Sequence, residues 1–131
     1  MRRMILSCFV IAGCTADRDP AFDRPRVVAG PVPLKSEVAY VDGALDRVVV
    51  VHADAADPRV ATIDIGRKPI WATPTPDRER LLVITRGEEA LARGQVDEEP
   101  RLWNVDVRNP DVVPVAYEIG SPYDRIAVSE D

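Results

Sequence analysis

The chain has 131 residues, with 17 Lys and Arg side chains against 22 Asp and Glu, which gives a formal net charge of −5. An acidic chain without a basic cluster repels phosphate backbones, so we expect no nucleic-acid binding. The only two cysteines, Cys8 and Cys14, both lie within the first fourteen residues. The composition therefore excludes a small secreted domain held together by disulfides.

The N-terminus has the pattern of an export signal. A basic head of two arginines is followed by the apolar residues 4–12, and Gly13 directly precedes Cys14. The apolar run is too short for a transmembrane helix, which needs about 20 residues. The pattern resembles the lipobox of bacterial lipoproteins, in which a peptidase cuts before the cysteine and the cysteine carries lipid. This implies a signal peptide over 1–13, cleavage between Gly13 and Cys14, and lipidation of Cys14. An ordinary signal peptide or an N-terminal helix is the alternative.

Lipidation would attach the protein to a membrane from outside the cytoplasm. Each buried methylene of an acyl chain contributes about 0.8 kcal/mol, so two or more chains hold a domain firmly. Cleavage removes two arginines and no acid, which leaves 15 basic against 22 acidic side chains and a charge of −7. Thr15, rather than aspartate, follows Cys14, and by the same resemblance this favours the outer membrane.

The segment 14–34 is predicted to be a lipid-anchored linker. It holds four prolines and few large apolar side chains, and proline both lacks an amide hydrogen and restricts the preceding residue. Val27-Val28-Ala29 could form a short edge strand, but an extended linker is the favoured interpretation.

From Lys35 onward the sequence predicts an all-β fold, because short runs rich in Val, Ile and Leu alternate with turns marked by Gly, Pro and Asp. The one competing helix, Glu88–Arg93, is too short to be stable alone. The predicted strands are Val38–Val41, Arg47–His52, Val60–Ile65, Arg80–Thr85, Leu102–Val107 and Val113–Ile119.

These runs repeat at one constant offset, the offset from Gly66 to Gly120. Ile63-Asp64-Ile65-Gly66 aligns with Tyr117-Glu118-Ile119-Gly120, and Val49-Val50-Val51 aligns with Trp103-Asn104-Val105. Repeats near 40–50 residues built from short strands are typical of propeller blades. The longer period found here fits a four-stranded blade that carries an insertion.

The order of motifs is similar to the YVTN-type bacterial β-propeller repeat. It runs from Val60-Ala61-Thr62-Ile63-Asp64-Ile65-Gly66 through Pro69 and Thr75-Pro76-Asp77 to the strand Arg80–Thr85. The sequence departs from the family where Arg78-Glu79 follows Asp77, since a glycine is usual there, so we expect an altered turn. The resemblance implies antiparallel four-stranded blades over residues 35–131, about two blades of a longer β-propeller.

On this template one blade is complete and its neighbours are partial. The predicted complete blade consists of Ile70–Thr73, Arg80–Thr85, Leu102–Val107 and Val113–Glu118, and Ile126–Ser129 would open a third. Propellers close rings of about 4–8 blades. We therefore expect either a fragment of a longer lipoprotein, which is favoured, or a chain that pairs with other chains to complete the ring. Open strand edges could also let copies of the chain associate. A two-sheet sandwich is the remaining alternative.

Few residues suggest chemistry. His52, the only histidine, has Asp54 and Asp57 close behind it, a set that could bind metal, although a polar turn is favoured. The insertion Arg86–Pro100 holds five carboxylates that could bind calcium, although a solvated acidic loop is favoured. Trp71 and Trp103 are predicted to be packing residues, with a sugar platform as the alternative for Trp71.

The sequence thus predicts a binding or interaction scaffold rather than an enzyme. Neither a G-x-S-x-G nucleophile motif nor a Gly-rich phosphate loop occurs in the chain, and we predict no catalytic residues, metal or cofactor. The alternative is the N-terminal part of a propeller enzyme of lactonase-like or quinoprotein-like type. A broken reading frame without a function of its own is a third reading.

Overall fold

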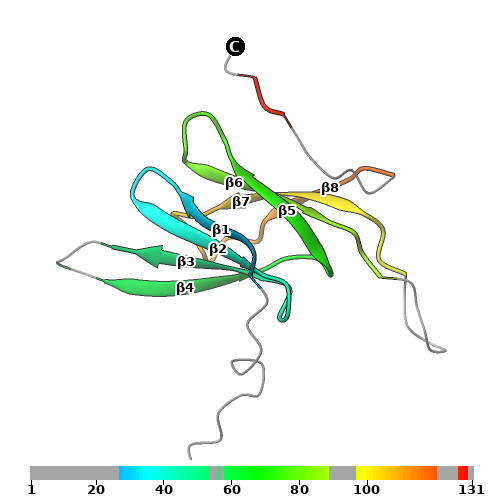
Figure 1. The fold of residues 1–131 in the computed structure, drawn as a ribbon, viewed down its shortest axis with the longest axis horizontal. Helices are drawn as coiled ribbons and strands as arrows, with labels where there is room; N and C mark the ends of the chain where they lie inside the picture. Colours follow the sequence, from blue (N-terminus) through cyan, green and yellow to red (C-terminus); the bar gives the residue numbers. More distant parts are fainter. Residues whose placement is uncertain (1–26, 54–55, 57, 89–96, 121–126, 130–131) are drawn as a thin grey trace, which may run out of the picture.

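The computed structural model describes residues 27–53, 56, 58–88, 97–120 and 127–129, which form eight strands and no helix. The strands make two antiparallel sheets, each in sequential order (Figure 1). Sheet 1 contains β1 (Val27–Pro33), β2 (Glu37–Asp42), β3 (Arg47–His52) and β4 (Arg59–Asp64). Sheet 2 contains β5 (Pro69–Pro74), β6 (Arg80–Thr85), β7 (Arg101–Asp106) and β8 (Val115–Glu118).

The all-β prediction is confirmed, and so is a single four-stranded sheet between Ile70 and Glu118. The strands at 47–52 and 80–85 have the predicted bounds, and the insertion 86–100 joins β6 to β7 as expected. Of the competing helix Glu88–Arg93, only Glu88 lies within the described residues, where it forms a β-bridge.

The predicted linker 14–34 is wrong in its last part, because residues 27–33 form β1, the first strand of sheet 1. Val32 is buried opposite Ala39 of β2. Pro31 and Pro33 are compatible with this position because β1 pairs with β2 alone, so one side of its backbone needs no ladder hydrogen bonds.

Two predicted strands differ at the C-terminal end. β8 begins at Val115 rather than Val113, after Pro114, which has no amide hydrogen for the ladder. The strand predicted at Ile126–Ser129 is not formed by residues 127–129, and Ile126 lies outside the described residues.

The aligned strands of the two sheets are not separated by one constant distance in the sequence. β3 and β7 begin at residues 47 and 101, which match the offset, whereas β2 and β6 begin closer together, at residues 37 and 80. The extra length lies between β6 and β7. Without it, the spacing of the two sheets falls within the 40–45 residues of a common four-stranded propeller repeat.

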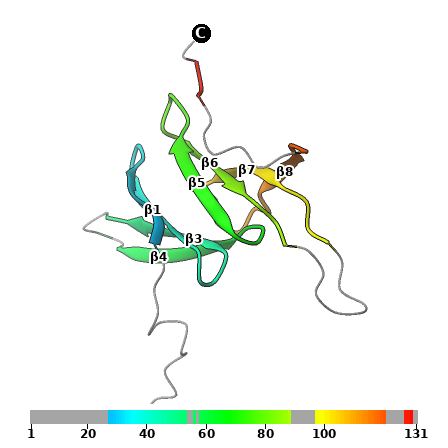
Figure 2. The same cartoon turned by 45° about the vertical axis from the view of Figure 1, so that its right-hand side comes forward.

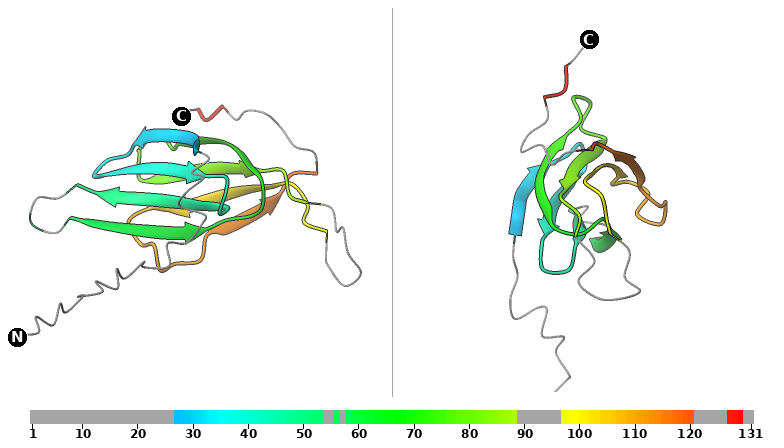
Figure 3. Two further views of the ribbon diagram at one scale, coloured as in Figure 1. Left: turned by 60° about the horizontal axis from the view of Figure 1, so that its bottom comes forward. Right: turned by 90° about the vertical axis from the view of Figure 1, so that its right-hand side faces the viewer.

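The two sheets pack face to face and share one apolar core. The first strands, β1 and β5, lie side by side (Figure 2), and the sheet of β1–β4 overlies that of β5–β8 (Figure 3, left). Alternate residues of each strand point into the interface, and fully burying one such side chain contributes about 1.5–3 kcal/mol. The core contains Val32, Leu34, Ala39, Val41, Val48, Val50, Ile63, Ile65, Leu81, Val83, Val105 and Val107.

The turn between β5 and β6 keeps a tight form despite the missing glycine. The Arg78 amide donates to the Thr75 carbonyl at 2.8 Å, and the Asp77 carboxylate accepts hydrogen bonds from the Thr75 hydroxyl and the Glu79 amide. Arg78 has a φ of 56°. It thus adopts the left-handed conformation that a glycine would adopt freely, at a cost of about 1–2 kcal/mol for a residue with a side chain.

Candidate functional site

Three connecting segments meet at one end of the molecule. Residues 65–68 link sheet 1 to sheet 2, and the amides of Arg86 and Gly87 donate to the carbonyls of Lys68 and Arg67, both at 3.0 Å. The β2–β3 turn joins them, because the Ile65 amide donates to the Asp46 carbonyl at 3.0 Å. The insertion therefore lies against the turn that links the sheets.

The base of the insertion is closed by backbone pairing. The amides of Glu88 and Glu98 donate to each other's carbonyls at 3.1 and 3.0 Å. Gly87 has a φ of 75°, and a Cβ atom there would collide with the Glu98 carbonyl oxygen. Only glycine fits this close approach, so Gly87 fixes where the loop leaves sheet 2.

The carboxylates of the insertion bind cations of the linking turn. The Glu88 carboxylate lies 2.8 Å from Arg67 Nη1 and 3.1 Å from Lys68 Nζ. Glu98 Oε1 accepts the Arg67 amide hydrogen at 3.0 Å. The hydrogen bond from Lys68, and then that from Arg67, holds the pKa of Glu88 below its usual range. The expected solvated acidic loop is therefore, within its described residues, an ion-paired structure.

Asp46 supports the same turn from sheet 1. Its Oδ1 accepts the Lys68 amide hydrogen at 2.9 Å, and its backbone is left-handed, with a φ of 51°, a conformation that aspartate tolerates better than most residues. Partial burial raises the pKa of Asp46, and the nearby Glu98 carboxylate adds to this, although the Lys68 amide opposes the rise.

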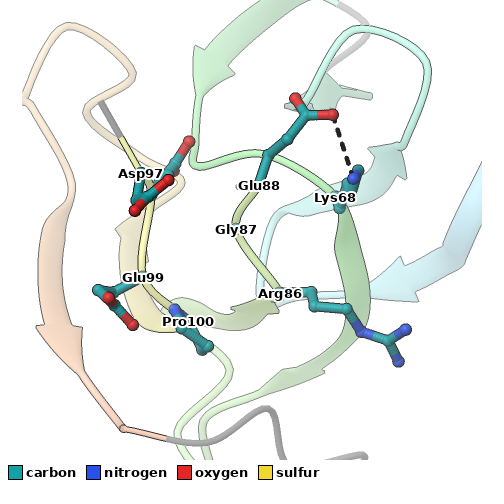
Figure 4. A pocket seen from close by; sticks show the side chains of 8 residues that line it. Lys68, Arg86, Gly87, Glu88, Asp97, Glu99 and Pro100 are labelled. Atoms are coloured by element: carbon teal, nitrogen blue, oxygen red, sulfur yellow. Dashed lines mark ion pairs between the residues drawn. The ribbon is translucent and has the colours of Figure 1, made fainter. Parts of the chain in front are cut away.

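A cleft of about 490 Å³ opens between these segments. Figure 4 shows Lys68 and Glu88 directed toward one another, Arg86 directed away from them, and Asp97 and Glu99 on the neighbouring segment. The cleft thus presents both signs of charge together with backbone groups, a surface that suits a polar ligand or a charged protein loop better than an apolar molecule.

Trp103 and Thr85 form the floor beneath this end. The indole Nε1 donates to the Thr85 hydroxyl at 2.9 Å, and Thr85 is fully buried. A Cβ atom on Gly66 would lie 2.9 Å from Trp103, so glycine lets the linking turn pass over the ring. Trp103 packs against the core, as predicted. Trp71 instead lies on the opposite face of sheet 2, beside Ile84.

His52 lies at the other end of sheet 1, away from the cleft. Its Nδ1 is 3.4 Å from the carboxylate of Glu37, its cross-strand neighbour, which is buried. Asp54 and Asp57 lie outside the described residues. Among the residues that the structure describes, no group of three or more His, Cys, Asp or Glu side chains is placed to hold a metal ion.

Sequence reasoning missed the cations of the site. Arg67 and Lys68 were not singled out, although two adjacent cations in a turn before Pro69 could have been matched with the acidic insertion that follows sheet 2's second strand. Glu37 and Asp46 were missed because only the strand register brings them to His52 and Lys68.

Gly13 and Cys14, the predicted cleavage and lipidation residues, lie outside the described residues. Within the part of the chain that the structure describes, no helix is long and apolar enough to cross a membrane. No protein-family model, curated protein or solved structure matches the chain.

Proposed function

We propose that the chain is a lipid-anchored, extracytoplasmic β-propeller protein that acts as a binding or interaction scaffold. One observation carries the proposal: two sequential four-stranded antiparallel sheets pack face to face with their first strands, β1 and β5, side by side. Consecutive blades of a propeller have this relation, because each blade begins at the central axis and packs on the next.

The end of the molecule that carries the cleft is the proposed binding surface. Its segments come from both sheets, and backbone hydrogen bonds and ion pairs hold them together, as at Gly87 and Glu88. A rigid scaffold that presents connecting loops is the usual arrangement of a binding surface. The mixed charge of the cleft favours a polar or charged partner.

The anchor is proposed from the lipobox-like sequence that ends at Cys14. A lipid on this residue would hold the two sheets at a membrane surface, with the outer membrane favoured by Thr15. Two or more acyl chains are sufficient for such attachment, without any spanning segment.

Metabolic labelling with a radioactive fatty acid tests the proposal. The full chain is expected to incorporate label and to partition into detergent, and Cys14→Ala is expected to abolish both. Cys8→Ala is the matched control, because it removes the other cysteine of the same segment and should retain label. Equal labelling of the wild type and Cys14→Ala would refute the anchor.

A further inference from the structure

The two sheets use opposite faces in their shared interface. In sheet 1 the inner face, which meets sheet 2, includes Val48 of β3 and Ile63 of β4. The repeat offset places these side chains at Leu102 of β7 and Tyr117 of β8. Leu102 and Tyr117 are cross-strand neighbours on the face of sheet 2 that points away from sheet 1.

The inner face of sheet 2 corresponds in the same way to the outer face of sheet 1. Val105, on the inner face of sheet 2, corresponds to Val51, which lies on the outer face of sheet 1 beside Val60. The outer face of sheet 1 is therefore the repeat equivalent of the face with which sheet 2 meets sheet 1. The two outer faces are thus equivalents of two surfaces that already pack together within one chain.

Both outer faces carry the apolar side chains of an interface. Tyr117 is 52% exposed and Val60 is 67% exposed. The apolar side chains on the outer face of sheet 2 are Trp71, Leu82, Ile84, Leu102, Val115 and Tyr117; Ile84 is already buried, and the polar Asn104 lies among them. Those on the outer face of sheet 1 are Val38, Tyr40, Val49, Val51 and Val60, with Thr62 beside Val49.

We propose that the chain associates head to tail with a second copy of itself, the outer face of sheet 2 packing on the outer face of sheet 1 of the next copy. This inference rests on the blade arrangement proposed above. The new contact would repeat the interface between the two sheets of one chain, so it needs no other partner chemistry. It differs from association through open strand edges because it joins faces.

A head-to-tail contact has a consequence that a symmetric contact lacks. Each copy contributes two different surfaces, so the contact forms a ring if its rotation closes and an open assembly if it does not. One surface can be disabled while the other stays intact. A copy altered only on sheet 1 should therefore still bind a copy altered only on sheet 2.

Co-purification of two differently tagged full-length copies, expressed together and extracted in mild detergent, tests this inference. The variants are Val60→Lys on the outer face of sheet 1 and Tyr117→Lys on the outer face of sheet 2. An unpaired ammonium buried in an apolar contact is strongly disfavoured. Val113→Lys is the control, because Val113 is 82% exposed and precedes β8.

Two wild-type copies and two Val113→Lys copies should co-purify. When both copies carry Val60→Lys, or both carry Tyr117→Lys, the amount of co-purified partner should fall at least about tenfold. A Val60→Lys copy together with a Tyr117→Lys copy should recover co-purification, because one intact contact remains between them. All pairs are extracted in the same detergent, so co-purification caused only by two copies sharing a micelle would be equal in every pair.

Wild-type copies that fail to co-purify, or a mixed pair that fails to recover, would overturn the inference. Co-purification of all pairs alike would overturn it too, because the outer faces would then not carry the contact. Labelling of Cys14 without co-purification refutes self-association and leaves the proposed anchor standing. Co-purification without labelling would refute the anchor and leave self-association standing, so the two failures are distinguishable.

Discussion

Positions that the constant sequence offset aligns are core in one sheet and surface in the other. Ile63 of β4 is 3% exposed, whereas Tyr117 of β8, which the offset aligns with it, is 52% exposed. Strand order and pairing are the same in both sheets. The difference arises because sheet 2 covers Ile63, while Tyr117 points away from sheet 1. Burial in this molecule is thus a property of the neighbouring sheet as much as of the strand itself.

The connections between the second and third strands differ even more. Sheet 1 joins β2 to β3 with residues 43–46, whereas sheet 2 joins β6 to β7 with residues 86–100. Lengthening a surface loop has a small entropic cost, because closure entropy grows only with the logarithm of length. The cleft and its ion pairs arise at this longer connection, so the insertion distinguishes sheet 2 chemically without changing its strand order.

The largest expected effect comes from truncating the equivalent residues of β4 and β8. Ile63→Ala should lower the free energy of unfolding by about 2–5 kcal/mol, because it removes buried methylenes and leaves a cavity. Tyr117→Ala should lower it by less than about 1 kcal/mol, since the side chain is half exposed.

Urea unfolding of both variants in a Val60→Lys background measures the difference without the contribution of self-association. The background matters because association of folded copies raises apparent stability. Equal losses at the two positions would mean that burial by the neighbouring sheet does not distinguish them, and the comparison would fail.

A smaller effect is expected at two equivalent glycines. Gly66→Ala should lower the free energy of unfolding by about 1–3 kcal/mol, because its Cβ would crowd the Glu98 carboxylate, Thr85 and Trp103. Gly120→Ala should lower it by about 1–2 kcal/mol for a different reason, since Gly120 has a φ of 70° and open space around it.

Substitution by asparagine distinguishes steric crowding at Gly66 from the left-handed backbone conformation at Gly120. Asparagine tolerates the left-handed conformation, so Gly120→Asn should be less destabilising than Gly120→Ala. At Gly66 the larger side chain should be worse than alanine. Thermal unfolding of the four variants checks this, and rescue by asparagine at Gly66 would contradict the crowding argument.

Much of the fold could be predicted from local sequence patterns. Short runs rich in Val, Ile and Leu located β3 and β6, and the constant sequence offset aligned β3 with β7. β1 was expected at most as a short edge strand at Val27–Ala29, because its prolines disfavour strands in general and only its position at the sheet edge makes them acceptable. Such a position is a tertiary property that local patterns do not contain.

The site was predicted in outline only. The acidic insertion was located by composition, but its partners Arg67 and Lys68 come from the turn between the sheets. Their approach depends on the close fit at Gly87 and on pairing between Glu88 and Glu98. The sequence contains these residues, but no local spacing brings them together, so the ion pairs could not be derived from it.

The smallest expected effect is a pH dependence of local stability, which should differ between the insertion and the short β2–β3 connection of sheet 1. The pKa of Glu88 is lowered in the folded state by Lys68 and Arg67. Its stabilising contribution is therefore present above the ordinary glutamate pKa of about 4.3, and is lost as pH falls through the lower folded value. We expect the amides at the base of the insertion to lose protection, measured against their intrinsic exchange rate at each pH, as the pH falls, and Glu88→Gln to show the lower protection already at neutral pH. Glu99→Gln is the control, because it removes the same charge from an exposed carboxylate in the same loop.

Asp46 should act in the opposite direction, and this makes the experiment specific. Burial raises the pKa of Asp46 in the folded state. Folding is therefore assisted by protonation of this group below its ordinary pKa, and that contribution is lost as pH rises through the raised value. Asp46→Asn removes this opposing contribution, so acid should weaken the linking turn more steeply in the variant than in the wild type.

If Glu88→Gln leaves the acid response of the Glu88 and Glu98 amides unchanged, the ion pairs with the linking turn do not hold the loop. Backbone pairing at Gly87 would then be sufficient to close it.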